Sequence, residues 1–154
     1  MRIAVAMSGG VDSSLTAILL REQGHQVVGL TARIHIAEEP AGSEPRPDLC
    51  CSPQSILDAA RVCEEAGFTH HVIDVEEEFR QEKERLQKIL DNIGRTPSPC
   101  IHCNARIKFK KLVDRARELG CHALATGHYA RVARTGEGRY YVTEGADAGK
   151  DQSY

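Results

Sequence analysis

Ser8-Gly9-Gly10-Val11-Asp12-Ser13 is the stretch of the sequence that decides the fold. It follows a short apolar run at residues 3–7 and opens a helical pattern at residues 14–20. A strand, a glycine turn and a helix start in this order form a cradle for phosphate, because glycine lets an oxyanion approach the main chain closely. The amide groups at the helix start and the helix dipole then attract the anion.

Polar side chains in this loop add to the cradle. The hydroxyl groups of Ser8 and Ser13 are further hydrogen-bond donors. The carboxylate of Asp12 fits beside phosphates either as a helix cap or through a bridging cation such as Mg²⁺. The loop matches neither the Walker motif nor the Gly-x-Gly-x-x-Gly pattern of dinucleotide-binding proteins. A capped helix after a glycine turn, with no ligand, is the alternative interpretation.

Composition places the chain among ordinary globular proteins, and its 154 residues suffice for one domain with a core. The net charge of −2 excludes a global basic field that would attract nucleic acid. The sequence has no signal-peptide pattern and no apolar run long enough to span a bilayer, so we expect a cytoplasmic protein without a membrane partner. The six cysteines of such a protein indicate metal, cluster or catalytic thiols before disulfides, although Cys63 falls on an apolar helical stripe and is expected in the core.

Strand and helix patterns alternate along the chain. Strands are expected at residues 2–7, 26–32, 71–75 and 123–126, and residues 139–143 suggest part of a hairpin. Helices are expected at residues 12–23, from 53 to the stop at Gly67, at 76–93, and at 105–119 with Asn104 as the cap. The alternation predicts an α/β fold with a doubly wound, mostly parallel sheet covered on both faces. Ligands of such folds bind beyond the carboxyl ends of the strands, where Ser8-Gly9-Gly10, Ala32 and Gly127 are expected.

The loop Gly94-Arg95-Thr96-Pro97-Ser98-Pro99-Cys100-Ile101-His102-Cys103-Asn104 is the second informative region. Its prolines favour an extended path that ends at a helix start, and a thiol at a helix N-terminus is shifted toward the nucleophilic thiolate. Cys100 and Cys103 therefore fit a nucleophilic or sulfur-relay pair. They also fit two ligands of an iron–sulfur cluster completed from elsewhere, or a zinc pair, for which no second matching pair follows.

Several motifs together resemble a known family. Residues 8–13 resemble the PP-loop of the N-type ATP pyrophosphatases, whose fold is adenine-nucleotide alpha-hydrolase-like. The cysteine loop, Ile107-Lys108-Phe109, residues 125–131 and the terminal Lys150-Asp151-Gln152-Ser153-Tyr154 resemble the tRNA-specific 2-thiouridylases, the MnmA family. The resemblance covers residues 1–154 and implies only the N-terminal PP-loop ATP pyrophosphatase catalytic domain, because the family continues into central and C-terminal β-rich domains that this chain lacks.

The resemblance implies an ATP-dependent tRNA sulfurtransferase. In this reaction ATP adenylates the C2 oxygen of the wobble uridine in the anticodon loop, pyrophosphate leaves, and a persulfide sulfur displaces AMP to give 2-thiouridine. The implied ligands and partners are ATP with Mg²⁺, tRNA, and a sulfur-donor or relay protein. A base that is exposed in a loop is accessible to such a pocket.

Site residues follow from the same match. The implied catalytic residues are Cys103, Asp12 and Cys100. The implied contacts to tRNA and the target base are Ser98, Pro99, Cys100, Lys150, Asp151 and Gln152. The implied ATP-binding residues are Ala6, Met7, Ser8, Gly9, Gly10, Val11, Asp12, Ser13, Ala32 and Gly127, and the matched motif also brings His128 near the phosphates.

The sequence departs from the family pattern at two positions. Many members carry Asp where Cys100 stands and Asn where Ser98 stands, and the resulting Cys-x-x-Cys favours a cluster with Cys100 and Cys103 as ligands or an internal disulfide. The family's second cysteine, the persulfide carrier, would lie beyond Tyr154. We therefore expect the isolated chain to bind ATP without completing thiolation.

Other functions stay open at this point. An amide- or amine-forming ligase with the same loop, such as GMP synthetase, NAD synthetase or tRNA lysidine synthetase, needs no cysteine pair. A cluster-binding tRNA-binding module would not need the ATP loop, and a nucleotide sensor would bind ATP without adenylating uridine. The basic helix fits either a solvated face or a contact to the tRNA backbone, and its cations are Arg106, Lys108, Lys110, Lys111, Arg115 and Arg117.

Overall fold

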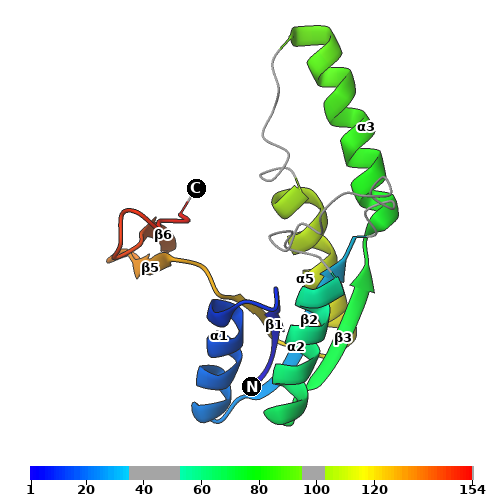
Figure 1. Cartoon of the computed structure of the whole chain (residues 1–154). Coiled ribbons are helices and arrows are strands. Elements are labelled where there is room, and N and C mark those ends of the chain that lie inside the picture. The colour runs from blue at the N-terminus through cyan, green and yellow to red at the C-terminus, as the bar shows by residue number, and fades with distance from the viewer. Residues whose placement is uncertain (35–52, 95–102, 154) are drawn as a thin grey trace.

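A parallel sheet organises the molecule, which is known here from a computed structural model that describes residues 1–34, 53–94 and 103–153. Its four strands are all parallel and follow the order β3-β2-β1-β4. A separate antiparallel pair, β5 and β6, forms the predicted hairpin and lies apart from this sheet (Figure 1). The strands are β1 (Arg2–Ala6), β2 (Gln26–Arg33), β3 (Thr69–Asp74), β4 (Ala123–Thr126), β5 (Ala130–Arg134) and β6 (Tyr140–Glu144).

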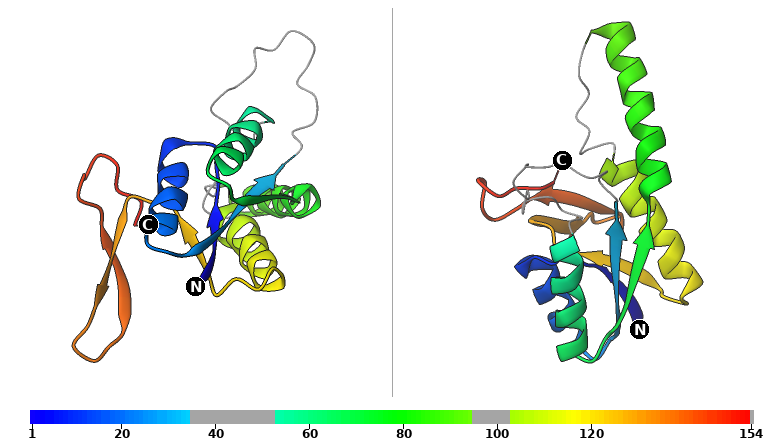
Figure 2. Two further views of the ribbon diagram at one scale, coloured as in Figure 1. Left: turned by 90° about the horizontal axis from the view of Figure 1, so that it is seen from below. Right: turned by 45° about the vertical axis from the view of Figure 1, so that its right-hand side comes forward.

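Helices cover both faces of the sheet, as the alternating pattern predicts (Figure 2). They are α1 (Val11–Glu22), α2 (Pro53–Glu65), α3 (Glu76–Ile93), the π-helical turn η1 (Cys103–Lys108) and α5 (Phe109–Glu118). Neighbouring residues of a strand point to opposite faces. Ala4 of β1 accordingly packs in the cluster that contains Leu112 of α5, whereas Val5 packs in the cluster that contains Ala17 of α1 and Cys63 of α2.

The strand order reverses at β1. The chain runs from β1 outward through β2 to β3 and then returns to place β4 on the other side of β1. The carboxyl ends of β1 and β4 therefore border the point where successive connections diverge. In open α/β sheets this point is where a crevice for a ligand forms.

Glycine residues end the helices where the sequence predicts. Gly24, Gly67 and Gly120 follow α1, α2 and α5 with φ of 81°, 71° and 70°. This left-handed conformation favours glycine over residues with a side chain and satisfies the last carbonyl groups of a helix. The expected stops are confirmed.

The start of the basic helix differs from the expectation. Asn104 does not cap a helix at residues 105–119, because Cys103–Lys108 form a π-helical turn and the regular α-helix begins only at Phe109. A π-helical turn holds more residues than an α-helical turn, and such turns are frequent at functional sites. Two smaller differences concern the strands. The strand expected from residue 71 begins at Thr69 as β3, and the strand expected to end at Ala32 continues to Arg33 as β2.

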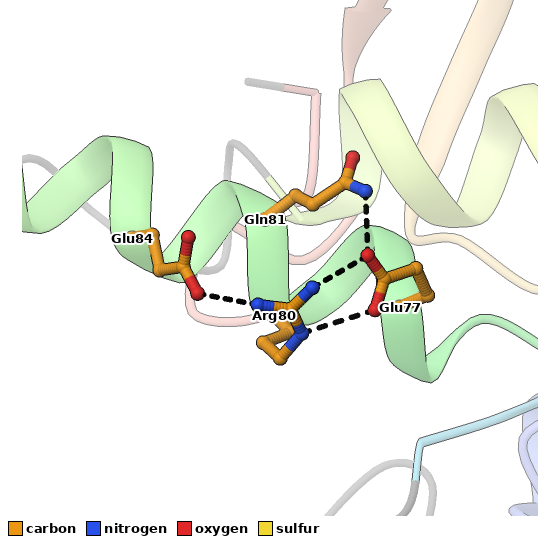
Figure 3. A network of polar contacts seen from close by, with 4 residues as sticks. All are labelled: Glu77, Arg80, Gln81 and Glu84. Atoms are coloured by element: carbon orange, nitrogen blue, oxygen red, sulfur yellow. Dashed lines mark hydrogen bonds and ion pairs between the residues drawn. The ribbon is translucent and has the colours of Figure 1, made fainter.

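Acidic residues at the start of α3 form a surface network (Figure 3). Arg80 donates hydrogen bonds to Glu77 and to Glu84, and Gln81 donates a further one to Glu77. The hydrogen bonds from Arg80, and then from Gln81, lower the pKa of Glu77. The network supports a long helix that extends beyond the sheet in Figure 1.

Ion pairs also neutralise part of the basic helix. Lys111 pairs with Glu78 of α3, Arg115 pairs with Glu118, and Arg117 pairs with Asp114. The hydrogen bond from Lys111 lowers the pKa of Glu78. These pairs favour a solvated face for this part of α5. Within the described residues, no helix has the length and apolar character needed to cross a bilayer.

Candidate functional site at the carboxyl ends of the strands

A cavity of about 310 Å³ opens at the carboxyl ends of β1 and β4. Its volume falls in the range that small-molecule sites occupy. Part of the wall is polar and part is apolar, so the cavity offers separate surroundings to an anionic group and to a ring. The lining residues are Ala6, Met7, Ser8, Gly10, Asp12, Ser13, Ala32, Asn104, Lys108, Phe109, Leu112, Thr126, Gly127, His128 and Gln152.

The glycine loop is held by Ser13. The Ser13 hydroxyl donates to the Gly10 carbonyl oxygen at 3.1 Å and accepts a hydrogen bond from the Ser8 amide at 3.2 Å. The hydroxyl oxygens of Ser8 and Ser13 lie 3.3 Å apart. Ser13 is buried and its hydroxyl proton is used in the bond to Gly10, whereas Ser8 is exposed. Ser8 is therefore the more accessible of the two serines that line the cavity.

Gly9 gives the loop its shape. Its φ of 77° lies in the left-handed region, and a Cβ there would collide with the backbone of Ser55 in α2. Any other residue would therefore force α2 and the loop apart. Gly10 is the N-cap of α1 and makes no side-chain cap hydrogen bond, so the cap residue itself leaves the amide groups of the helix start available to an anion.

Asp12 lies in the first turn of α1 rather than at its N-cap. The helix-cap interpretation of Asp12 is therefore wrong, because Gly10 occupies that position. Asp12 is one of the lining residues of the cavity, and its carboxylate accepts a hydrogen bond from the hydroxyl group of Tyr129 at 3.2 Å. Its oxygens are thus directed toward the segment that follows β4.

Gly127 brings this segment against the glycine loop. A Cβ at Gly127 would lie 2.6 Å from the carbonyl carbon of Asp12 and 2.7 Å from the amide nitrogen of Ser13. Only a residue without a side chain permits such an approach. His128 follows in the cavity wall, and its ring centroid lies 5.8 Å from that of Phe109 in α5.

The terminal segment contributes one residue, Gln152, to the cavity wall. The carboxylate of Asp151 accepts hydrogen bonds from the Gly145 amide at 2.6 Å and from the Ser153 hydroxyl at 2.8 Å. The bond from Gly145, and then that from Ser153, lowers the pKa of Asp151. Gln152 reaches the cavity, whereas Lys150 and Asp151 are not among its lining residues.

Most of the expected ATP-binding residues come together around this cavity. Gly9 instead supports the loop against α2, and the side chain of Val11 is 80% exposed and does not line it. The structure adds Asn104, Phe109 and Leu112, which sequence reasoning did not select. Asn104 ends the cysteine loop and Phe109 belongs to the Ile107-Lys108-Phe109 motif, whereas no motif pointed to Leu112. The ligand roles of all these residues stay predictions.

The cysteine loop is mostly beyond what the structure describes. Ser98, Pro99 and Cys100 lie outside the described residues, and so does the side chain of Cys103, whose backbone begins η1. Asn104 and Lys108 of the same turn line the cavity. Within the described part of the chain, no group of three or more His, Cys, Asp or Glu side chains is arranged to hold a metal ion, a finding that leaves the cluster alternative for Cys100 and Cys103 untested.

Comparison with known proteins identifies the family. A family model described as the tRNA methyl transferase HUP domain matches residues 1–154. The chain belongs to this family. The tRNA-specific 2-thiouridylase MnmA of Geobacter metallireducens is 48% identical over 156 residues, which are 99% of this chain and 42% of that protein. The MnmA of Salinibacter ruber is 46% identical over 156 residues, again 99% of this chain but 40% of the relative. The family resemblance is confirmed, and the chain spans about two fifths of these relatives.

Solved structures support the fold. The glutamine-dependent NAD⁺ synthetase of Acinetobacter baumannii, solved with ADP, has a TM-score of 0.61 at 19% identity over 82% of this chain and 22% of that one. The NMN synthetase of Francisella tularensis has a TM-score of 0.54 at 17% identity over 82% of this chain and 45% of its own. At such identities the likeness shows the fold alone, and the expected adenine-nucleotide alpha-hydrolase-like fold of this family is confirmed.

Proposed function

We propose that this chain is the ATP-using catalytic domain of an enzyme that forms 2-thiouridine in tRNA. The cavity carries the proposal, because the glycine loop, the uncapped start of α1 and Gly127 meet there beside the switch in strand order. The names of the relatives support tRNA as the substrate and do not favour an amide-forming ligase. A similar fold by itself does not specify the reaction, so the ligase alternative gains nothing from the solved structures.

ATP fits the two kinds of wall in the cavity. The phosphates would lie at the amide groups of Gly10 and the first turn of α1, where the helix dipole favours negative charge. The adenine would lie against apolar residues of the cavity wall, and Ala32, Phe109 and Leu112 are the candidates. Asp12 and Ser8 offer the hard oxygen ligands that Mg²⁺ prefers, and the ion would neutralise charge on the departing pyrophosphate.

The proposed reaction begins at the target base. The C2 oxygen of the wobble uridine attacks the α-phosphorus of ATP, a new O–P bond forms, and the bond to the bridging oxygen breaks as pyrophosphate leaves with the electron pair. The activated oxygen then departs with AMP when the outer sulfur of a cysteine persulfide attacks C2. A second thiol attacks the inner sulfur, the S–S bond breaks with its electron pair on the sulfur that stays on the uridine, and the two cysteines are left as a disulfide. Amide groups fixed at the helix start stabilise the charge that develops on pyrophosphate without reorganising.

The remaining roles of this proposal fall on the cysteine loop and the terminal segment. Cys103 is the proposed second thiol, which releases the sulfur from the persulfide of another cysteine, with Cys100 as its partner or as a second cluster ligand, and a separate protein would deliver the sulfur. Ser98, Pro99 and Cys100 would approach the base, and Lys150, Asp151 and Gln152 would contact the tRNA. We place the reaction in the cytoplasm, where unmodified tRNA is present.

Pyrophosphate release tests this proposal. The chain is mixed with Mg-ATP, with and without unmodified tRNA that carries a wobble uridine. We expect release that depends on tRNA and falls about 100-fold in Asp12→Asn, since fixed charge at a transferring phosphoryl group has effects of this order. Asp91→Asn is the matched control, because Asp91 is exposed on α3 and is not part of the cavity wall.

Three outcomes would contradict the proposal. The first is an absence of ATP binding in a direct titration. The second is release that is equal in Asp12→Asn and in the wild type, because the cavity would then not be the site. The third is release that depends on ammonia or another amine instead of tRNA, which would favour a ligase with the same loop.

A further inference from the structure

Tyr129 connects two parts of the site that are far apart in the sequence. Its hydroxyl group donates to Asp12 of the glycine loop at 3.2 Å, across 117 positions of the chain. Gly127, two residues earlier, touches the backbone of the same loop. The side chain of Tyr129 thus reaches α1 from a segment that is already seated against it.

The backbone of Tyr129 is held by Gln152. The side-chain oxygen of Gln152 accepts a hydrogen bond from the backbone amide of Tyr129 at 3.1 Å. The backbone amide of Gln152 donates to the Tyr129 carbonyl oxygen at 2.9 Å. The ammonium group of Lys150 lies 5.2 Å from the centre of the Tyr129 ring. The backbone amide, the carbonyl group and the ring of Tyr129 are therefore all in contact with residues 150–152.

Residues 150–152 are themselves anchored, so they do not move independently of Tyr129. Asp151 holds the amide of Gly145 at the end of the hairpin. A Cβ at Gly145 would lie 2.8 Å from the carbonyl oxygen of Tyr129, so the backbones of Gly145 and Tyr129 are packed closely together. A shift of residues 150–152 therefore shifts Tyr129, and with it the hydrogen bond to Asp12.

We propose that Tyr129 is a positioning residue that couples residues 150–152 to Asp12, so that RNA on this segment and ATP in the cavity strengthen each other's binding. The inference rests on the proposed function, because it takes RNA as the ligand of residues 150–152. A cation beside an aromatic ring suits an RNA strand, which offers phosphates to the cation and bases to the ring. Coupling between two ligands is reciprocal, so each must change the other's affinity by the same factor.

Binding measurements on the whole chain test the coupling. The ligands are a Mg²⁺ complex of an ATP analogue with a methylene α,β-bridge, which does not react, and an anticodon stem-loop RNA with an unmodified wobble uridine. In the wild type we expect each ligand to raise the affinity of the chain for the other about fivefold, at the lower end of usual coupling factors. Tyr129→Phe removes only the hydroxyl group. It should leave the affinity for the analogue alone within about twofold and abolish the tightening, since only the bond between positioned groups is lost.

Controls separate coupling from a general structural effect. Tyr141→Phe alters another partly exposed tyrosine, on β6, and should retain the wild-type coupling. Tyr129→Phe should also keep the wild-type urea midpoint, because the bond it loses is exposed to solvent. Undiminished coupling in Tyr129→Phe, or two ligands that bind the wild type with no coupling, would overturn the inference and leave the proposed function standing. A wild type that does not bind the analogue alone would overturn both.

Discussion

Gly127→Ala is the substitution that tests the architecture of the site most directly. The added Cβ would lie 2.6 Å from the carbonyl carbon of Asp12, 2.7 Å from its carbonyl oxygen and 2.7 Å from the amide nitrogen of Ser13. Carbon atoms in contact normally lie about 3.5 Å or more apart. Because all three neighbours are backbone atoms, no side chain can rotate away, and the glycine loop must retreat by about 1 Å.

This retreat has two expected consequences. Overpacking of this kind costs about 1–3 kcal/mol, which corresponds to a fall of roughly 1 M in the urea midpoint for a small protein. A displacement of about 1 Å in a reacting group lowers a rate up to about 100-fold, so pyrophosphate release should fall by more than the loss of stability explains. The effect would come from the contact, because Gly127 has no positive φ.

Urea unfolding, titration with the ATP analogue and pyrophosphate release measure these consequences. Gly136→Ala is the matched control, because a Cβ there meets no atom within 4 Å and Gly136 has no positive φ. It should behave as the wild type in all three assays. If Gly127→Ala also kept the wild-type midpoint, affinity and release, the close approach of the segment after β4 to the loop would be refuted.

Two further predictions concern the buried contact between β2 and α2. Gly29→Ala places a Cβ 2.6 Å from the Sγ of Cys63, so urea unfolding should show a loss of about 1–3 kcal/mol in the free energy of unfolding. Cys63→Ala in the same chain should restore much of this stability. A double variant no more stable than Gly29→Ala would contradict the contact. Burial raises the pKa of the Cys63 thiol to about 11. The folded chain therefore keeps a proton on Cys63 that the unfolded chain loses from about pH 9. Up to about 3 kcal/mol of the free energy of unfolding should be lost between pH 9 and 11 in the wild type but not in Cys63→Ala. Parallel pH profiles of stability in the two proteins would contradict the raised pKa.

Local patterns were enough to locate most elements. The expected helix at residues 76–93 and the strand at residues 123–126 coincide with α3 and β4, and the glycine stops after three helices are confirmed. These features depend on residues within a few positions of one another, so the sequence carries their whole signal. The predicted start of α5 was wrong, because the π-helical turn at Cys103–Lys108 has no local signature that separates it from a capped α-helix.

By itself, the sequence determined the alternation of strands and helices, the glycine loop after β1 and the family to which the chain belongs. Tertiary structure alone decided that β4 lies beside β1, that Gly127 touches the Asp12 backbone and that Tyr129 reaches the carboxylate. The physical reason is that periodicity specifies which face of an element is apolar but not which partner covers it. Contacts across more than a hundred residues arise only when the strand order brings both segments to one edge of the sheet.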